Sequence, residues 1–163
     1  MSEISVRISE EEDGKFLRKW LMDPLVLRWF PLDNEREVDD AIRIWLSYKD
    51  IGCSFTGCIN GIPCGMAVLY LHRYKKLRHQ SLFAIIVDDN YRGRGIGTKI
   101  FNYLKQEAQE KFSLEILHLE VYEGNPAKTL YDRLGFAQYG IQEEFLKEKD
   151  GTYRDKINMQ LYL

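Results

Sequence analysis

Apolar residues follow two different periods along this chain, and the period changes from one segment to the next. Where apolar and polar residues alternate, or where a short apolar run is unbroken, we expect a strand, and where apolar residues recur every three to four positions we expect a helix. The predicted strands cover residues 3–9, 53–59, 63–71, 81–87, 115–122, 136–146 and 152–162. The predicted helices cover residues 11–22, 35–49, 95–111 and 126–134.

Turn residues between these segments indicate how the segments connect. Asn60-Gly61 predicts a tight hairpin between two strands, because this pair accepts the backbone angles that such a turn requires. Asp23-Pro24 ends the first helix, since the residue before a proline avoids helical backbone. Hairpins join antiparallel strands, whereas the strand-helix-strand unit in the middle of the chain implies a parallel pair. We therefore expect a single α/β (α+β) domain over residues 1–163, with a mixed, mostly antiparallel sheet of about seven strands and about four helices.

The composition is that of an ordinary globular protein. Of the 163 residues, 45% are hydrophobic and 29% are charged, a mix that excludes extended disorder. The formal net charge of −2 provides no overall field that would attract nucleic acid or an acidic membrane. No apolar run approaches the length that spans a membrane, and the N-terminal residues do not resemble a signal peptide. We therefore expect a cytoplasmic protein whose partners include neither nucleic acid nor a membrane.

The three cysteines are Cys53, Cys58 and Cys64. Their odd number and their spacing match neither a disulfide framework nor a usual zinc site. We expect them to be buried as small apolar side chains in the reduced state, and we expect no metal.

The strongest chemical signal follows the apolar run at 81–87, where a glycine-rich turn leads directly into a helix. The turn reads Arg92-Gly93-Arg94-Gly95-Ile96-Gly97-Thr98. Free N–H groups at a helix start bind anions, glycines let a ligand approach the backbone closely, and arginines bind phosphate. The segment is neither a Walker loop nor the dinucleotide fingerprint, in which the third glycine comes one residue later. The turn is therefore a candidate pyrophosphate cradle, and the alternative is a turn with exposed arginines and no ligand.

This turn resembles the cofactor loop of the GNAT superfamily of acetyl-CoA-dependent N-acetyltransferases. The family pattern Arg/Gln-x-x-Gly-x-Gly/Ala is matched by Arg92, Gly95 and Gly97. A second stretch, from Gly124 to Phe136, resembles the other hallmark of that family, and the order of elements agrees over nearly the whole chain. The resemblance implies an enzyme that transfers an acetyl group from acetyl-CoA to a primary amine without a metal.

The resemblance also implies where acetyl-CoA binds. The strand at 81–87 would splay from the next strand at its end, and the pantetheine arm would fill the gap and bond to the strand backbone. The turn would hold the pyrophosphate, and Asn125 in the second motif would bond to the pantetheine arm. The implied cofactor-binding residues are Ile85, Ile86, Val87, Arg92, Gly93, Arg94, Gly95, Ile96, Gly97, Thr98, Asn125 and Lys128.

Two catalytic residues follow from the same resemblance. Tyr131 would face the thioester sulfur and act as general acid for the departing thiolate, and the alternative is that it is a core residue on the apolar face of its helix. Glu120 is the candidate base for the amine, and a bound water or a surface role for Glu120 is the alternative. His118 lies two residues away on the same strand face and is a weaker candidate.

The acceptor is indicated only by analogy. Residues 21–30 and 150–155 resemble the branch that acetylates ribosomal-protein N-termini and aminoglycoside 6′-amines, which implies that Trp29 and Phe30 line the acceptor site. The expected partner is therefore an amine-bearing small molecule or peptide. Exposed edges of the C-terminal strands are also consistent with a homodimer. A non-catalytic acyl-CoA-binding module, or a transferase with a longer acyl donor or a non-amine acceptor, stays open as an alternative. Acidic residues after Phe30 either attract a cationic amine or form a solvated helix face. These are Asp33, Glu35, Asp39 and Asp40.

Overall fold

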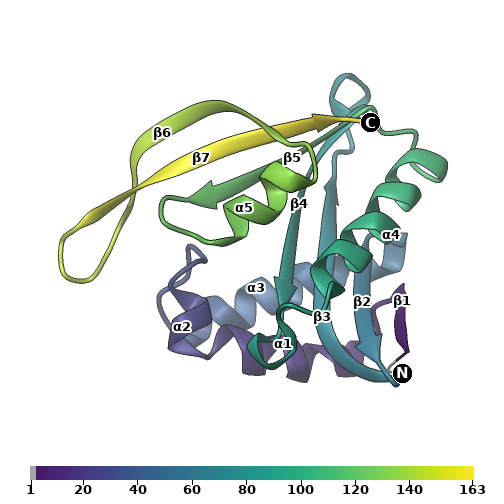
Figure 1. Ribbon diagram of the computed structural model, residues 1–163, viewed down its shortest axis with the longest axis horizontal. Coiled ribbons are helices and arrows are strands. Elements are labelled where there is room, and N and C mark those ends of the chain that lie inside the picture. The colour runs from purple at the N-terminus through teal and green to yellow at the C-terminus, as the bar shows by residue number, and fades with distance from the viewer. Residues whose placement is uncertain (1–2) are drawn as a thin grey trace.

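A seven-stranded sheet in the order β1-β2-β3-β4-β5-β7-β6 forms the centre of the computed structural model, which describes residues 3–163 (Figure 1). The strands are β1 (Ile4–Ile8), β2 (Ser54–Ile59), β3 (Ile62–Leu71), β4 (Gln80–Val87), β5 (Ile116–Tyr122), β6 (Ala137–Lys147) and β7 (Tyr153–Tyr162). The helices are α1 (Gly14–Leu21), α2 (Pro24–Leu27), α3 (Glu35–Ser47), α4 (Ile96–Glu110) and α5 (Ala127–Arg133). Short 3-10 turns lie at Glu11–Asp13, Tyr48–Ile51, Lys75–Leu77 and Asp89–Tyr91. Every strand and helix expected from the apolar pattern is therefore present, and the fold class is confirmed.

Helix α2 is the element that the apolar pattern did not predict. Asp23-Pro24 ends α1 as expected, but the same pair also starts α2. Pro24 occupies the first helical turn, where no N–H is needed, and the Asp23 carboxylate accepts a hydrogen bond from the Leu25 N–H at 3.0 Å. The chain therefore turns sharply at this point instead of leaving the helical layer.

The hairpin at Asn60-Gly61 has the backbone angles that its sequence predicts. Both residues have positive φ, 49° for Asn60 and 79° for Gly61, as a type I′ turn between antiparallel strands requires. Gly135, just beyond α5, also has a positive φ of 94°, which matches the glycine that commonly ends a helix.

The pairing of β4 with β5 is parallel and short. It joins Gln80–Leu82 to Ile116–His118, and every other strand pair in the described sheet is antiparallel. Beyond these residues β4 continues to Val87 and β5 to Tyr122 without pairing to each other. Figure 1 shows the two halves of the sheet diverging here, which confirms the splayed strand pair.

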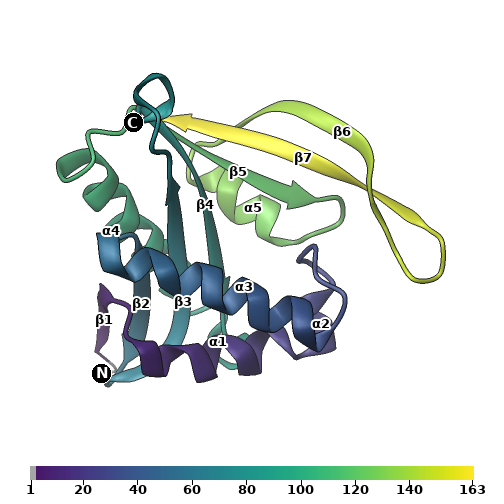
Figure 2. The ribbon, with the colours of Figure 1, turned by 180° about the vertical axis from the view of Figure 1, so that it is seen from behind.

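Each face of the sheet carries its own apolar core. Helices α4 and α5 cover one face, where Phe101 and Leu104 pack with Phe83 and Leu119. Helices α1 to α3 cover the opposite face, as the reverse view in Figure 2 shows. Since alternate residues of a strand point to opposite faces, β4 contributes Phe83 to the first core and Ile86 to the second.

A pair of glycines lets α4 approach β2 and β3 closely. Gly57 and Gly65 lie opposite each other in the two strands, and the side chain of Ile100 fits against them. A Cβ atom added at Gly57 would lie 2.7 Å from Ile100, and one added at Gly65 would lie 2.8 Å from Ile100 and 2.9 Å from the backbone oxygen of Ile86. The glycines therefore set the position of α4, whose first turn forms the candidate anion site.

The cysteines are free and buried, as their spacing indicated. Burial raises the pKa of the Cys53 and Cys64 thiols to about 11, so both remain protonated at neutral pH. Within residues 3–163, no helix is both long enough and apolar enough to cross a membrane.

Candidate active site

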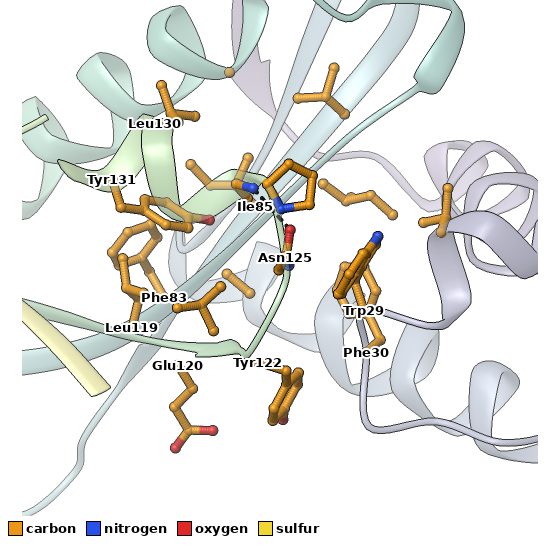
Figure 3. A pocket seen from close by; sticks show the side chains of 18 of the residues that line it. Trp29, Phe30, Phe83, Ile85, Leu119, Glu120, Tyr122, Asn125, Leu130 and Tyr131 are labelled. Carbon is orange, nitrogen blue, oxygen red and sulfur yellow. Dashed lines mark hydrogen bonds between the residues drawn. The ribbon is translucent and has the colours of Figure 1, made fainter. Parts of the chain in front are cut away.

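One cavity of about 670 Å³ passes through the gap between β4 and β5. On the α4 and α5 face it is lined by the glycine-rich turn, the end of β4 and α5. On the other face it is lined by the turn after α2, by α3 and by β3 and β5. The cavity is therefore lined from both faces of the sheet, and in Figure 3 Tyr131 lies on one side of it and Trp29 and Phe30 lie on the other. Its volume is within the usual range of small-molecule sites.

The glycine-rich turn takes a backbone conformation that only glycine adopts without strain. Gly93 and Gly95 have φ values of 76° and 78°, and Gly95 is the residue immediately before the first turn of α4. No side chain or backbone atom lies within 4 Å of where a Cβ of either glycine would be, so the space beside them is open. Ile96 is buried in the core and fixes the helix start, so the N–H groups of the turn lie at the edge of the cavity.

The two arginines of this turn are exposed and differ in their surroundings. Arg92 lines the cavity, and its Nε lies 2.6 Å from the Asp89 carboxylate. The Arg94 guanidinium lies 5.5 Å from the centre of the Tyr91 ring and is outside the cavity lining. An anion at this position would therefore compete with Asp89 for Arg92.

Strand β4 offers an unused backbone edge to the cavity. Ile85, Ile86 and Val87 pair with β3 on one side and have no strand partner on the side of β5. All three line the cavity. Their free edge can bind an extended ligand that carries amide groups, in the way that a neighbouring strand would.

Residues of the second motif are divided between the cavity and the surface. Asn125 lines the cavity, where its Oδ1 accepts from the Ala127 N–H at 2.9 Å and its Nδ2 is left to donate (Figure 3). Lys128 is on the outer face of α5, where its Nζ lies 3.2 Å from Asp132, and it is not part of the lining. Arg94 and Lys128 are thus the two implied cofactor residues that the structure leaves outside the cavity.

Tyr131 is buried in the core on the α5 side but reaches the cavity. Its ring packs edge-on against Phe83 and Phe136, with centroid distances of 6.3 and 5.9 Å. The hydroxyl points into the cavity toward Asn125 (Figure 3). Burial raises the pKa of Tyr131 to about 12, so the group is a hydrogen-bond donor at neutral pH.

Glu120 lies on the other face of β5. Its neighbours Leu119 and Val121 pack in the same core as Tyr131, so the side chain of Glu120 points the opposite way. It lines the cavity, and its carboxylate lies 3.3 Å from the Lys156 Nζ. The structure therefore places the two candidate catalytic residues at the same gap but on opposite faces of the sheet.

His118 shares the face of Glu120 but not its position. It lies outside the cavity lining and pairs with the Gln80 side chain. Burial, together with the nearby His72, lowers the pKa of His118, which therefore is neutral at physiological pH.

Trp29 and Phe30 form part of the cavity wall on the α1 to α3 side (Figure 3). Both come from the turn after α2, and the tip of Trp29 lies beside Gly124, since a Cβ added at Gly124 would lie 3.8 Å from its Cη2 atom. The guanidinium groups of Arg28 and Arg154 lie 4.5 and 5.1 Å from the centre of its ring. These cation–π contacts hold the indole in place.

The acidic residues near the start of α3 are paired with cations. Arg18 bonds to both Glu35 and Asp39, and Arg43 lies 3.5 Å from Asp40. Lys149 lies 3.4 Å from Asp33, and none of the four carboxylates lines the cavity. Of the two sequence interpretations, the solvated helix face agrees with these contacts.

Comparison with known proteins agrees with this geometry. Residues 15–136 match the sequence model of the acetyltransferase (GNAT) family. This chain belongs to the acetyltransferase (GNAT) family. A [ribosomal protein bS18]-alanine N-acetyltransferase of Haemophilus influenzae is 31% identical over 87 residues, which are 53% of this chain and 59% of that protein. A spermine/spermidine N(1)-acetyltransferase of Bacillus subtilis is 31% identical over 104 residues, 63% of this chain and 67% of that protein.

Solved structures of GNAT proteins share the whole fold. The ribosomal-protein-alanine N-acetyltransferase from Brucella melitensis superposes with a TM-score of 0.81 at 24% identity, over 98% of this chain and 99% of that chain. The structure of yncA from Salmonella typhimurium, which contains its cofactor acetyl-CoA, has a TM-score of 0.80 at 21% identity, over 98% and 94% of the two chains. At these identities the likeness shows the fold alone. The chain spans about three-fifths of the curated relative from H. influenzae, so activity and substrate remain to be argued from the site.

Two tyrosines of this GNAT cavity were missed by the sequence analysis. Tyr70 of β3 and Tyr122 of β5 line it on the same face as Glu120. Burial raises the pKa of each to about 12, and the charge of Glu120 adds to the effect. The two-residue period of β5 could have predicted Tyr122, which lies two positions after Glu120, but no local pattern joins Tyr70 to the site.

Proposed function

We propose that this GNAT protein transfers an acetyl group from acetyl-CoA to a primary amine, on a small molecule or a protein N-terminus, by direct attack with both substrates bound. The observation that carries this proposal is the continuous cavity through the sheet. It joins the glycine-rich turn and the free edge of β4 to Tyr131, and through the gap to the wall at Trp29 and Phe30. Relatives named for acetylating an alanine of a ribosomal protein and for acetylating spermidine support an amine acceptor.

The chain's own residues fit the parts of acetyl-CoA. The turn from Gly93 to Thr98 offers N–H groups, open space and the Arg92 charge to the pyrophosphate. The unpaired edge of β4 at Ile85 to Val87 suits the two amides of the pantetheine arm, and the Asn125 Nδ2 can donate to the same arm. Arg94 stays in the proposed cofactor site only as an exposed positive charge in the glycine-rich turn. Lys128 stays in the proposal only because it belongs to the second motif.

The chemistry requires one bond to form and one to break. Bound acetyl-CoA supplies an activated thioester; the amine nitrogen bonds to its carbonyl carbon, and the carbon–sulfur bond breaks with its electron pair on sulfur. The nitrogen, positively charged after the attack, releases its extra proton to solvent and becomes the amide nitrogen. Tyr131, protonated at neutral pH, donates to this sulfur from the α5 side. Since the pKa of Tyr131 is well above the usual pKa of a thiol, about 8.5, we infer a strong hydrogen bond that stabilises the thiolate while solvent supplies the final proton.

The amine enters as an ammonium ion and must lose a proton before it attacks. Glu120 lies on the acceptor side of the gap and is the carboxylate that lines the described cavity. We propose that it accepts this proton directly or through a water molecule, and the Lys156 Nζ, 3.3 Å away, helps to position its carboxylate. A non-catalytic acyl-CoA-binding module would not require a buried tyrosine hydroxyl at the gap.

We also retain a cytoplasmic location as a prediction, which rests on the three free cysteines.

The test is a thiol-release assay with acetyl-CoA and a panel of peptides, polyamines, amino sugars and aromatic amines, followed by mass spectrometry of the products. The proposal predicts that at least one amine gains the mass of one acetyl group while an equal amount of free CoA appears. Binding of acetyl-CoA without thiol release for any amine would instead support the regulatory module. Faster transfer from a longer acyl-CoA than from acetyl-CoA would support the longer-acyl alternative.

A further inference from the structure

The acceptor half of the cavity is apolar and aromatic. Its wall on the α1 to α3 face includes Trp29, Phe30 and Ile44, with Tyr70 and Tyr122 from the sheet. Arg92 and Arg133 are the positively charged residues in the whole described lining, and Glu120 is the negatively charged one. An acceptor that enters here therefore exchanges water mostly for aromatic and aliphatic side chains.

The one carboxylate of this lining is already partly neutralised. Glu120 lies 3.3 Å from the Nζ of Lys156, whose side chain is only 12% exposed. Lys156 is itself held 4.0 Å from the centre of the Phe145 ring, which stacks on Tyr122. Glu120 can receive one ammonium group, but the described lining offers no second carboxylate to a second ammonium group.

Two cations also lie against Trp29 in the acceptor wall. Arg28 and Arg154 hold the ring of Trp29, and Arg154 is only 15% exposed. The Glu148 carboxylate pairs with Arg154 at 3.0 Å, and the Arg28 guanidinium is a further cation at the ring. The acids at the start of α3 are bonded to cations of their own and lie outside the lining, so they are not placed to balance a polycation in the cavity. A second positive charge on the acceptor would therefore find no second carboxylate in the described lining to pair with.

We infer that the acceptor is a monoamine whose amino group is attached to an aromatic or branched aliphatic group, and that this site discriminates against polyamines and aminoglycosides. This inference rests on the proposed function, since it assigns the acceptor class of the same site. The apolar group would lie against Trp29 and Phe30, and the single ammonium would lie near Glu120. The relative named for spermine and spermidine would then differ from this chain in acceptor class.

Two matched pairs of amines separate the apolar contribution from the charge contribution. Phenethylamine against ethylamine tests the ring, and butylamine against putrescine tests a second charge on the same carbon chain. We expect kcat/KM to be about tenfold or more higher for phenethylamine than for ethylamine, because the ring is buried in the site. We expect kcat/KM to be about tenfold or more higher for butylamine than for putrescine, because the second charge of putrescine is disfavoured there. Each amine is measured at saturating acetyl-CoA.

A charge substitution tests whether α3 is the acceptor wall. Ile44 lines the cavity and is 46% exposed, so Ile44→Glu adds a second carboxylate without burying it. This variant should raise the ratio of kcat/KM for putrescine to that for butylamine by about tenfold. Ile51→Glu is the matched control, since Ile51 is 52% exposed and outside the lining, and its ratio should equal that of the wild type.

The possible results separate the two proposals. A preference for phenethylamine and butylamine, with the expected response of Ile44→Glu, supports the inference. Higher kcat/KM for putrescine or spermidine in the wild type, or an unchanged ratio in Ile44→Glu, overturns the acceptor class and leaves acetyl transfer to amines intact. Binding of acetyl-CoA with no acetylation of any amine overturns both.

Discussion

Tyr131 combines a buried ring with a hydroxyl that reaches the cavity. The ring contacts Phe83 and Phe136 in the core, and the same burial raises the pKa of its hydroxyl to about 12. A tyrosine in water would already be protonated at neutral pH, so burial does not change its charge. Burial instead removes competing water, which strengthens a hydrogen bond to a developing negative charge.

Tyr131→Phe removes this hydroxyl and keeps the packing. We expect kcat to fall by about 10²-fold or more, because a donor to the leaving sulfur acts mainly in the transition state, while the Kd for acetyl-CoA stays within about twofold. The measurement is steady-state thiol release, with calorimetry for the Kd. Tyr139→Phe, at a tyrosine that is 55% exposed on β6, is the control and should behave as wild type. Equal kcat in Tyr131→Phe and wild type would assign Tyr131 to the core alone.

At the scale of elements, the position of α4 on the sheet depends on the absence of side chains below it. Gly57 and Gly65 face each other across β2 and β3, and Ile100 fills the space that their missing Cβ atoms leave. Because the first turn of α4 is also the candidate phosphate site, packing under the middle of the helix and ligand binding at its start are linked.

Gly65→Ala should therefore destabilise the protein. The added Cβ would lie 2.8 Å from Ile100 and 2.9 Å from the Ile86 backbone oxygen, so α4 or β4 must shift. Overpacking of this kind costs about 2 kcal/mol in free energy of unfolding, measured by urea denaturation. Gly140→Ala is the matched control, since nothing lies within 4 Å of a Cβ there, and it should change stability by less than about 0.5 kcal/mol. Equal stability of the two variants would contradict the proposed role of the glycine pair.

A buried ion pair joins β1 to the start of α1. Asp13 is 2% exposed and accepts hydrogen bonds from Arg7 at 2.7 and 3.0 Å and from Thr56 at 2.8 Å. Burial alone would raise the pKa of Asp13, but the hydrogen bonds from Arg7, Thr56 and the Glu10 N–H outweigh it and lower the pKa below its ordinary value of 3.8. The folded state therefore prefers the ionised carboxylate.

Asp13→Asn should lower the free energy of unfolding by about 2 kcal/mol at neutral pH, since Arg7 loses its charged partner. The stability that ionised Asp13 contributes is fully present above its ordinary pKa of 3.8 and is lost as the pH falls through its lower folded pKa. The difference between wild type and variant should therefore shrink below about pH 4, as measured by urea denaturation at several pH values. A difference that stays constant down to about pH 3 would contradict the lowered pKa.

The elements and the place of the glycine-rich turn at the start of α4 could be predicted because their signals are local. Arg92, Gly95 and Gly97 lie within six residues, and their chemistry depends on one turn. Helix α2 was missed because Asp23-Pro24 ends one helix and begins another with the same two residues. The sequence could not predict that Arg94 and Lys128 lie outside the cavity lining. A motif identifies a residue but does not show which way its side chain points.

The cavity wall on the α1 to α3 face depends on contacts between distant segments, which is why the sequence indicated only part of it. Tyr70 and Glu120 meet at one cavity from strands fifty residues apart, and the cation–π pair of Trp29 with Arg154 joins the turn after α2 to β7. At the scale of the whole molecule, the short β4–β5 pairing creates the gap, and helices on both faces of the sheet contribute to the cavity wall. A homodimer through the exposed β6 edge stays a prediction.

Calorimetric titration measures directly whether the glycine-rich turn and the cavity behind it bind acetyl-CoA. We expect saturable one-to-one binding to the wild type and binding at least about tenfold weaker to Arg92→Ala/Arg94→Ala, which loses charge-assisted hydrogen bonds to phosphate. Arg73→Ala/Arg78→Ala removes the same number of charges from exposed residues outside the cavity lining and should bind like the wild type. An absence of binding heat at high protein concentration, or equal affinity of the Arg92/Arg94 variant and the wild type, would contradict the account.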